Sequence, residues 1–325
     1  MAVFHNQDIS NKHFLVTGGA GFIGSHIVEY LLSHGAGLVR IIDNLSSGSE
    51  QNIHLFEKYP NYEFWIGDIR NPDVCLKACD GIDYVSHQAA LGSVPRSVSD
   101  PISTNEVNVN GFVNMITAAK NAGVKTFVYA SSSSVYGDEP VLPKVEEKTG
   151  NLLSPYAVSK MANELYAKVF ANLYGMKIAG LRYFNVFGSR QDPNGPYAAV
   201  IPLFVKGILN QSPVYIYGDG EQTRDFTFVE NAVQANIKGM LCENDAAYNN
   251  VYNVAVGKNF SVNYLYKAIT EILNINHEAI YKEPRNGDIH DSLADISKAC
   301  NLLNYQPTTH FLEGLKLTVE SFSKK

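Results

Sequence analysis

The stretch VTGGAGFIGS, from Val16 to Ser25, places three glycines at a regular spacing between an apolar segment and an amphipathic one. The apolar residues before it predict a buried strand, and the residues after it predict a helix. Glycine at Gly18, Gly21 and Gly24 permits a tight turn and lets a pyrophosphate approach the amino end of the helix, where free N–H groups favour anions. The stretch therefore predicts a strand, a turn and a helix that bind a dinucleotide.

The same alternation of strand and helix continues along the chain. Five further apolar segments follow, separated by amphipathic stretches: LVRIIDN, YEFWIGDIR, IDYVSHQAA, VKTFVYASS and MKIAGLRYFN. Such repetition indicates a parallel sheet with helices on both faces, which binds ligands outside the carboxyl ends of its strands. We therefore expect an α/β protein with a Rossmann-type doubly wound parallel sheet.

The character of the sequence changes after Val186, where glycine and proline become more frequent and the alternation becomes less regular. We expect residues 1–185 to form the dinucleotide-binding domain and residues 186–325 to form a smaller, mostly C-terminal substrate-binding domain. Residues 225–257 again have the patterns of a helix and a strand. We expect this segment to return and pack on the first domain.

The composition excludes several classes of protein. The 325 residues carry a formal net charge of -6 without clusters of lysine and arginine, which argues against nucleic acid or an anionic membrane surface as a partner. No apolar run reaches the length of a membrane span, and the first residues do not resemble a secretory signal, so we expect a cytoplasmic protein. The 4 cysteines and 9 histidines lack the spacing of metal ligands, so we expect no metal site.

Two aspartates follow predicted strands. Asp43 lies about 20 residues beyond the glycine turn, where a carboxylate accepts both hydroxyls of an adenosine ribose and repels a 2′-phosphate. Its position predicts NAD rather than NADP as the cofactor. Asp68, in GDIR, has two interpretations: it contacts the adenine, or it caps the next helix.

A serine run and a tyrosine–lysine pair lie further along the chain. SSSSVYGDEP, from Ser131 to Pro140, follows an apolar segment and places four small hydroxyls at the carboxyl end of a buried strand. Tyr156 and Lys160, four residues apart in SPYAVSKMANELYAKVFANLYG, project from one face of a predicted helix. An ammonium group and a nicotinamide cation both stabilise a phenolate, so Tyr156 is a candidate base. Each feature alone is common on protein surfaces, but together with the glycine turn they indicate NAD-dependent chemistry.

The combination of TGGAGFIG, SSSSVYG and SPYAVSK resembles the extended short-chain dehydrogenase/reductase family that acts on nucleotide sugars, over essentially the whole chain. Four stretches are similar to bacterial UDP-N-acetylglucosamine 4-epimerases: HQAALGSVPRS, LSPYAVSK, GLRYFNVFGSRQDPNGPYAAVIP and GDGEQTRDF. The resemblance implies an isomerase that uses NAD to invert C4 of a UDP-sugar, converting UDP-N-acetylglucosamine to UDP-N-acetylgalactosamine.

The resemblance also implies roles for individual residues. Ser132, Tyr156 and Lys160 would be catalytic, with Ser132 bridging Tyr156 and the sugar O4, whereas Ser131 and Ser134 would be structural. The implied cofactor contacts are Gly18, Gly21, Phe22, Ile23, Gly24, Asp43, Asn44, Ser47, Gly48, Asp68, Ile69, Gln88, Ala89, Ala90, Asn108, Tyr156, Lys160 and Tyr183. The implied substrate contacts are Gly92, Ser93, Ser132, Ser133, Asn185, Ala199, Val200, Tyr215, Tyr217, Arg224, Arg285, Asp288 and Ser292.

Ser292 bears on the size of the sugar. It stands where simple UDP-galactose 4-epimerases of this family place a tyrosine, so a serine would leave room for an N-acetyl group. The alternative is that Ser292 is a helix N-cap or a loop residue without a ligand contact.

Several alternatives stay open. The substrate could be the uronic acid of UDP-N-acetylglucosamine or UDP-glucose, and a nucleotide-sugar decarboxylase would share the same motifs. Dehydratases of the family carry an Asp-Glu pair where this chain has Ser133 and Ser134, and an NAD-sensing binding module would be expected to lose Tyr156 or Lys160.

The resemblance further implies a homodimer formed through a helix that includes Met161, Leu165 and Val169, although an apolar stripe is first of all interpreted as core.

Overall fold

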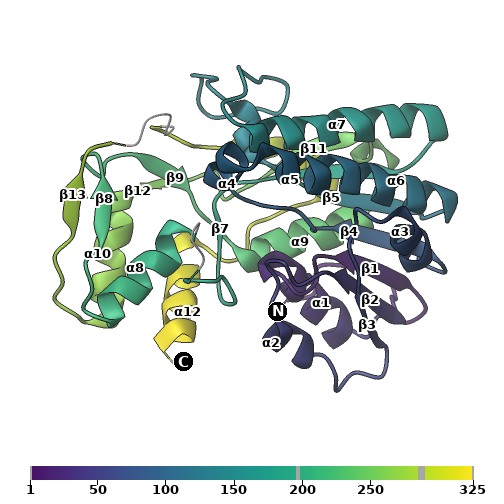
Figure 1. The fold of residues 1–325 in the computed structure, drawn as a ribbon, viewed down its shortest axis with the longest axis horizontal. Helices are drawn as coiled ribbons and strands as arrows, with labels where there is room; N and C mark the ends of the chain where they lie inside the picture. Colours follow the sequence, from purple (N-terminus) through teal and green to yellow (C-terminus); the bar gives the residue numbers. More distant parts are fainter. Residues whose placement is uncertain (1, 195–197, 285–289, 324–325) are drawn as a thin grey trace.

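The computed structural model describes residues 2–194, 198–284 and 290–323. Its central feature is a parallel sheet of seven strands (Figure 1). Their order across the sheet is β11 (Asn250–Val254), β6 (Ile178–Tyr183), β5 (Thr126–Ser132), β4 (Tyr84–His87), β1 (His13–Thr17), β2 (Leu38–Asp43) and β3 (Tyr62–Ile66). The order reverses direction between β1 and β4, as in a doubly wound sheet. The predicted Rossmann-type fold is confirmed.

Helices cover both faces of the sheet. One face carries α1 (Phe22–Ser33) and α9 (Val229–Met240), whose apolar residues share a single buried cluster. The other face carries α3 (Pro72–Cys79), α6 (Gly111–Asn121) and α7 (Pro155–Tyr174) over a second cluster. The two clusters bury both sides of the strands, which explains why the strand sequences are continuous apolar runs.

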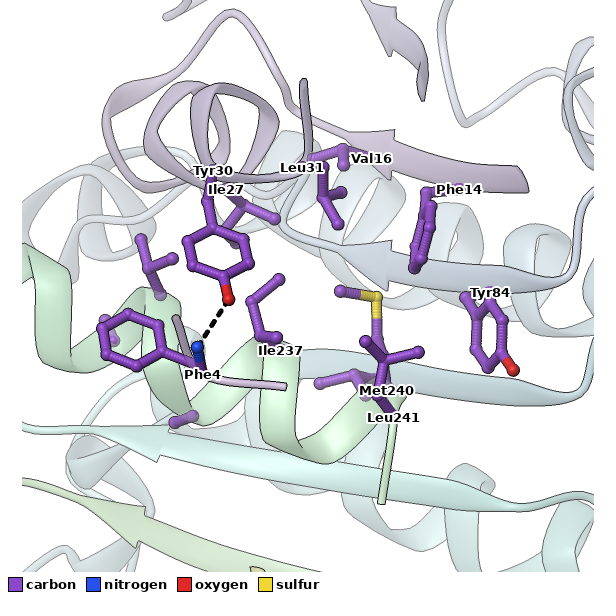
Figure 2. Close-up of a cluster of buried hydrophobic side chains, with 14 of the residues drawn as sticks. Phe4, Phe14, Val16, Ile27, Tyr30, Leu31, Tyr84, Ile237, Met240 and Leu241 are labelled. Atoms are coloured by element: carbon purple, nitrogen blue, oxygen red, sulfur yellow. Dashed lines mark hydrogen bonds between the residues drawn. The ribbon is translucent and has the colours of Figure 1, made fainter. Parts of the chain in front are cut away.

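The segment from α9 to β11 belongs to the sheet layers although it follows the first six strands by many residues. Figure 2 shows Ile237 and Met240 of α9 packed with Ile27 and Leu31 of α1 in one buried cluster. In the same cluster the hydroxyl of Tyr30 accepts a hydrogen bond from the backbone N–H of residue 4 at 2.6 Å. Helix α9 also contacts β4, β5 and β6, so its inner face lies directly behind the strands that carry the predicted site.

A smaller group of elements lies beside the sheet (Figure 1). Its helices α8 (Val200–Leu209), α10 (Val262–Leu273) and α12 (Phe311–Ser323) pack around a third apolar cluster. Its paired strands are β8 (Tyr215–Tyr217) with β13 (Ile280–Lys282), β9 (Thr223–Asp225) with β12 (Asn259–Ser261), and β7 (Val186–Phe187) with β10 (Thr227–Phe228). The remaining elements are α2 (Glu50–His54), α4 (Val94–Ser99), α5 (Pro101–Asn105), a π-helical turn (Glu106–Asn110), α11 (Ser297–Leu303) and the 3₁₀ turns Ser133–Tyr136 and Asp245–Ala247.

The apolar stripe on α7 is not core. Leu165 is 59% exposed and Val169 is 49% exposed, while Met161 is only partly buried. The interpretation of this stripe as core is therefore wrong, because the buried face of α7 is the face that carries Ala157, Ala167 and other small or polar residues. Among the helices of the described ranges, none has the length and apolarity needed to cross a bilayer.

Candidate active site

The glycine turn forms a cradle between β1 and α1. Gly18 has a φ of +69°, and a Cβ added there would lie 2.7 Å from the backbone nitrogen of Ala89. A Cβ on Gly24 would collide with the carbonyl oxygen of Gly18. Gly21 begins the helix without a side-chain cap, and the first turn carries no acidic residue. The turn therefore leaves helix N–H groups and space available for an anion, which fits the pyrophosphate of NAD.

Asp43 lies at the end of β2, next to this turn. Its Oδ2 accepts the backbone N–H of Ala20 at 3.0 Å, and its Oδ1 accepts that of Leu45 at 2.8 Å. Burial raises the pKa of Asp43, while these two backbone hydrogen bonds lower it. Gly48 packs against this group, since a Cβ there would lie 3.1 Å from Oδ1. The carboxylate is held in one orientation and keeps lone pairs for further donors.

Asp68 does not cap the next helix. The side chain of Asn71 caps α3, and Asp68 instead accepts hydrogen bonds from Asn44 at 2.9 Å and from Arg70 at 2.7 Å. The hydrogen bond from Arg70 is the main reason that the pKa of Asp68 falls to about 2. The capping interpretation is wrong, and Asp68 lies at the cleft as a charged group.

A cleft of about 520 Å³ runs along the carboxyl ends of β1, β2, β4 and β5. The predicted residues that line it are Gly18, Gly21, Phe22, Ile23, Gly24, Asp43, Asn44, Ser47, Asp68, Ile69, Gln88, Ala89, Ala90, Gly92, Ser93, Tyr156, Lys160 and Tyr183. The lining residues that were not predicted are Ile42, Ser46, Gly67, Leu91, Arg96, Val107, Ala130, Ser131, Asp192 and Ala198. Most of these are chain neighbours of predicted residues, so reading each strand end as a whole would have found them.

Tyr156 and Lys160 project into this cleft from the first turns of α7. Ser154 caps the helix by accepting the N–H of Ala157, and Pro155 fits its first position. The ammonium of Lys160 donates to the carbonyl oxygen of Ala130 at 2.7 Å, and burial lowers the pKa of Lys160 to about 8.

Ser132 lies near Tyr156 at the end of β5, and its Oγ accepts the backbone N–H of Ser134 at 3.2 Å. Burial raises the pKa of Tyr156, and the Ser132 hydroxyl lowers it. Lys160 Nζ lies 5.9 Å from the centroid of the Tyr156 ring. Ionisation of the phenol needs positive charge nearby to offset the cost of burial, and the ammonium of Lys160 supplies such a charge.

Asn108 supports the cleft from behind and does not line it. It lies in the π-helical turn, where its Oδ1 accepts the N–H of Leu91 at 2.7 Å. Its Nδ2 donates to the carbonyl oxygen of Leu91 at 3.2 Å and to Ser159 at 3.1 Å. The π turn thus joins the strand end after β4 to α7.

A buried ion pair lies directly beneath the serine run. Arg182 of β6 donates to both oxygens of Glu164 of α7, at 2.9 and 2.7 Å, and Ser131 of β5 donates to Glu164 at 2.5 Å. Ser131 therefore has a structural hydrogen bond, while the Oγ of Ser134 is buried without a partner in the described chain. The carboxylate of Glu164 thus joins β5, β6 and α7, which all carry site residues.

The predicted substrate residues near the cleft lie on different elements. Ser93 caps α4 by accepting the N–H of Arg96 at 3.1 Å, and Gly92 precedes it. Ser133 begins the 3₁₀ turn after β5. Asn185 has a φ of 36° and donates to the carbonyl oxygen of Asp225 at 3.3 Å. Of these, Gly92 and Ser93 line the cleft with the cofactor residues.

The other predicted substrate residues belong to the smaller group of elements. Ala199 precedes α8 and Val200 begins it, while Tyr215 and Tyr217 lie on β8. Arg224 of β9 donates to the carbonyl oxygens of Thr223 at 2.8 Å and His290 at 3.1 Å. Two further predicted contacts, Arg285 and Asp288, fall outside the described residues.

Ser292 follows Asp291, which forms a bridge with Thr223 of β9. Its backbone N–H donates to the carbonyl oxygen of Thr223 at 3.1 Å. No described helix begins at Ser292, so the N-cap alternative is wrong. Its small side chain stands beside the strand that carries Arg224.

A second hollow, of about 470 Å³, opens between the amino ends of β4, β5 and β6. These are the strand ends that point away from the cleft of Tyr156. Lys125 and Lys177 line it, and they are paired with Asp83 at 2.8 Å and Asp245 at 2.6 Å. Ligands of doubly wound sheets bind at the carboxyl ends, so the candidate site is the cleft of Tyr156.

Comparisons with known proteins agree with this geometry. Residues 14–255 match the model of the NAD dependent epimerase/dehydratase family. A putative UDP-glucose 4-epimerase of Methanocaldococcus jannaschii is 41% identical over 308 residues, covering 94% of this chain and 96% of the relative.

Two solved structures are similar along almost their whole length. One is UDP-N-acetylglucosamine 4-epimerase from Methanobrevibacter ruminantium in complex with UDP-N-acetylmuramic acid, with 43% identity, a TM-score of 0.91 and coverage of 97% and 99% of the two chains. The other is Thermus thermophilus UDP-glucose 4-epimerase in complex with NAD, with 34% identity, a TM-score of 0.85 and coverage of 96% and 99%.

Proposed function

This chain belongs to the NAD-dependent epimerase/dehydratase family, and on that premise we propose that it is a 4-epimerase of UDP-N-acetylhexosamines, interconverting UDP-N-acetylglucosamine and UDP-N-acetylgalactosamine. The observation that carries the proposal is that Tyr156 and Lys160 of α7 line the same cleft as the glycine turn and Asp43, with Lys160 held at the end of β5 by its hydrogen bond to Ala130. A candidate base and a positive charge therefore lie beside a dinucleotide site.

NAD, when bound, accepts a hydride from the sugar and returns it, so the reaction needs no external oxidant. The turn at Gly18 and Gly24 would hold the pyrophosphate, and the carboxylate of Asp43 would accept hydrogen bonds from the ribose hydroxyls. Because the cofactor is restored in each turnover, the protein gains by keeping it bound.

Tyr156 takes the proton of the sugar O4 and later returns it, with Ser132 bridging the two oxygens. The ammonium of Lys160 and the positive charge of the oxidised cofactor favour the phenolate, which burial alone disfavours. The hydrogen bond of Lys160 to Ala130 fixes where this positive charge lies.

The substrate side supports an acetamido sugar. Ser292, whose side chain is smaller than a tyrosine, lies next to β9, and Arg224 of that strand supplies a guanidinium suited to a diphosphate. The 3₁₀ turn begins with Ser133 and Ser134, so it offers no carboxylic acid for the elimination of water.

Arg96 supports a second candidate substrate. A UDP-sugar with a C6 carboxylate needs a basic partner, and Arg96 lines the cleft beside Ser93. The second candidate is therefore a 4-epimerase of the uronic acid of UDP-N-acetylglucosamine. Arg96→Gln should lower kcat/KM for the uronic acid by about 10-fold or more while changing that for UDP-N-acetylglucosamine little, if this candidate is right.

The proposal is tested by offering the purified protein UDP-N-acetylglucosamine, its uronic acid, UDP-glucose and UDP-glucuronic acid without added NAD. NMR of the products should show inversion at C4, with the highest kcat/KM for UDP-N-acetylglucosamine. Tyr156→Phe is the matched inactive control. Release of carbon dioxide with a pentose product would instead identify a decarboxylase.

We also propose that the chain forms a homodimer through α7 and the adjoining α4 and α5. Leu165 and Val169 of α7 are exposed together with Val98 and Ile102 of the two shorter helices, which pack against α7. Such a contiguous apolar face on neighbouring helices fits a second copy of the same face.

Light scattering should give twice the chain mass for the wild type and a monomer for Leu165→Glu. Leu317→Glu, at an exposed leucine of α12, is the control that should leave the mass unchanged. A monomeric wild type would contradict the dimer.

A further inference from the structure

Asn236 is a fully buried residue of α9 that the sequence patterns did not single out. Its Nδ2 donates to the hydroxyl of Tyr183 at 2.7 Å, and its Oδ1 accepts from Gln88 at 2.9 Å and from Ser86 at 3.1 Å. The Tyr183 hydroxyl in turn donates to Gln88 Oε1 at 2.9 Å. Asn236, Tyr183 and Gln88 therefore form a closed ring of hydrogen bonds.

The ring has a fixed direction. Asn236 donates to two partners, the hydroxyl of Tyr183 and the carbonyl oxygen of Ala232, and accepts from two others, which a carboxamide does and a carboxylate or a hydroxyl of the same reach does not. Turning the Asn236 amide over would bring two N–H groups face to face between Asn236 and Gln88, and turning the Gln88 amide over would bring two carbonyl oxygens face to face. A buried network in which every member is satisfied holds its side chains in one arrangement.

Two members of the ring line the cleft and Asn236 does not. Tyr183 and Gln88 form part of the wall of the cleft that Lys160 also lines, whereas Asn236 touches the cleft only through them. The ring uses the proton of the Tyr183 hydroxyl for Gln88 and one lone pair for Asn236. Of the two phenols in the cleft, Tyr183 is thus committed to the wall, and Tyr156 takes no part in the ring.

We propose that Asn236 is a positioning residue that holds Tyr183 and Gln88 as a rigid wall for the nicotinamide end of the cofactor and keeps the Tyr183 hydroxyl out of proton transfer. This inference rests on the proposed function for the place of the nicotinamide. Asn236 acts through its two partners and contacts neither cofactor nor sugar.

The same helix offers a matched control. Asn231 is equally buried, and it donates to the carbonyl oxygen of Thr309 at 2.7 Å and accepts the N–H of Thr308 at 2.9 Å. Its hydrogen bonds hold a loop far from Tyr183 in the sequence, and Asn231 does not line the cleft. A purely structural role for Asn236 would make Asn236→Leu and Asn231→Leu behave alike.

The experiment compares Asn236→Leu, Asn231→Leu and the wild type by three readouts. The first is NAD content as purified and NAD affinity of the stripped protein, measured without substrate. Asn236→Leu should bind NAD about 3- to 10-fold more weakly, the effect of one or two lost hydrogen bonds, and Asn231→Leu should bind it as the wild type does. Both variants should lower the melting temperature.

The second readout is steady-state kinetics, and the third is absorbance at 340 nm after turnover. Asn236→Leu should lower kcat by about 10-fold or more with KM for the UDP-sugar changed less than about 3-fold, and more of its cofactor should remain reduced. Combining it with Tyr183→Phe should add little to either loss, because both changes break the same hydrogen bond.

If Asn236→Leu does not fold, Asn236→Asp replaces it. That variant keeps both acceptors and removes the donor to Tyr183, and it should give the same pattern. Normal NAD affinity, kcat and residual absorbance in a folded Asn236 variant, with only a lower melting temperature, would overturn the proposal. A wild type that binds NAD but epimerises no UDP-sugar would contradict the proposed function while leaving the NAD-affinity test of Asn236 intact.

Discussion

Lys160 joins α7 to β5 through the hydrogen bond from its ammonium to the carbonyl oxygen of Ala130, 2.7 Å away. One helical turn later the carboxylate of Glu164 accepts a hydrogen bond from Ser131. Two successive turns of α7 are therefore attached to neighbouring residues at the end of β5. These hydrogen bonds hold Tyr156, one turn before Lys160, at a fixed distance from the end of the strand.

Lys160→Met should make the cofactor-free protein more stable at pH 7. Burial lowers the pKa of Lys160 to about 8, so between pH 8 and about 10.5 the folded protein binds fewer protons than the unfolded chain. The free energy of unfolding of the wild type should rise across this window by up to about 3 kcal/mol relative to Lys160→Met.

Urea denaturation at pH 7, 8, 9 and 10 measures this difference. Lys168→Met, at an exposed lysine of the same helix, should show a stability difference from the wild type that does not change with pH. If the difference in unfolding free energy between Lys160→Met and the wild type were also independent of pH, Lys160 would not carry the buried charge described here.

Tyr156→Phe should lower turnover by about 100- to 10,000-fold, the usual effect of losing a general base. The melting temperature and the NAD content should change little, because one hydroxyl at the cleft contributes little packing. Ser132→Ala should cost less, since a water can replace a bridging hydroxyl. Tyr183→Phe removes the other phenol of the cleft and should lower turnover by at most about 10-fold. This difference would distinguish the roles of the two tyrosines. Equal losses for both would contradict the roles assigned here.

Gly18→Ala should release NAD. Alanine at this position has a strained φ of +69°, and its Cβ would lie 2.7 Å from the backbone nitrogen of Ala89. Gly123→Ala is the matched control, since its φ is +70° and nothing lies within 4 Å of the added Cβ. Gly123→Ala should lose about 1–2 kcal/mol of stability from backbone strain, and Gly18→Ala should lose more because of the added clash, but only Gly18→Ala should be purified without NAD. Full NAD content in Gly18→Ala would show that the cradle is not needed.

Ser292→Tyr should change the choice of sugar. A phenol ring in place of the hydroxyl should lower kcat/KM for UDP-N-acetylglucosamine by about 100-fold and spare that for UDP-glucose. The ratio of the two values is the measurement, because general damage lowers both alike. Ser297→Tyr, at an exposed serine of the neighbouring α11, should leave the ratio as it is.

Local sequence patterns were sufficient to predict the sheet and the residues on the cofactor side of the cleft. The six strands up to β6 are short apolar runs with clear limits, and the turn at Gly18 needs glycine for reasons that lie within ten residues of sequence. Tyr156 and Lys160 share a helical face by spacing alone. These features depend on neighbours in the chain, and sequence periodicity reports such neighbours well.

Features that depend on distant segments could not be read in the same way. Asn236 meets Ser86 and Gln88 from a helix about 150 positions further along, and one asparagine in an amphipathic helix carries no signal of such a contact. The stripe of Leu165 shows that periodicity identifies an apolar face without identifying what covers it. Asp68 illustrates a smaller limit, since Asp68 and Asn71 are both possible caps before α3 and only Asn71 accepts its N–H groups.

The most direct test follows the hydrogen at C4 of the sugar. UDP-N-acetylglucosamine labelled with deuterium at C4 is converted in ordinary water by the protein as purified, and the product is analysed by NMR and mass spectrometry. If the cleft of Tyr156 and Ser132 performs transient oxidation with return of the same hydride, UDP-N-acetylgalactosamine should retain the deuterium at C4. Loss of the label to solvent would mean that the C4 hydrogen leaves as a proton, and it would contradict this account.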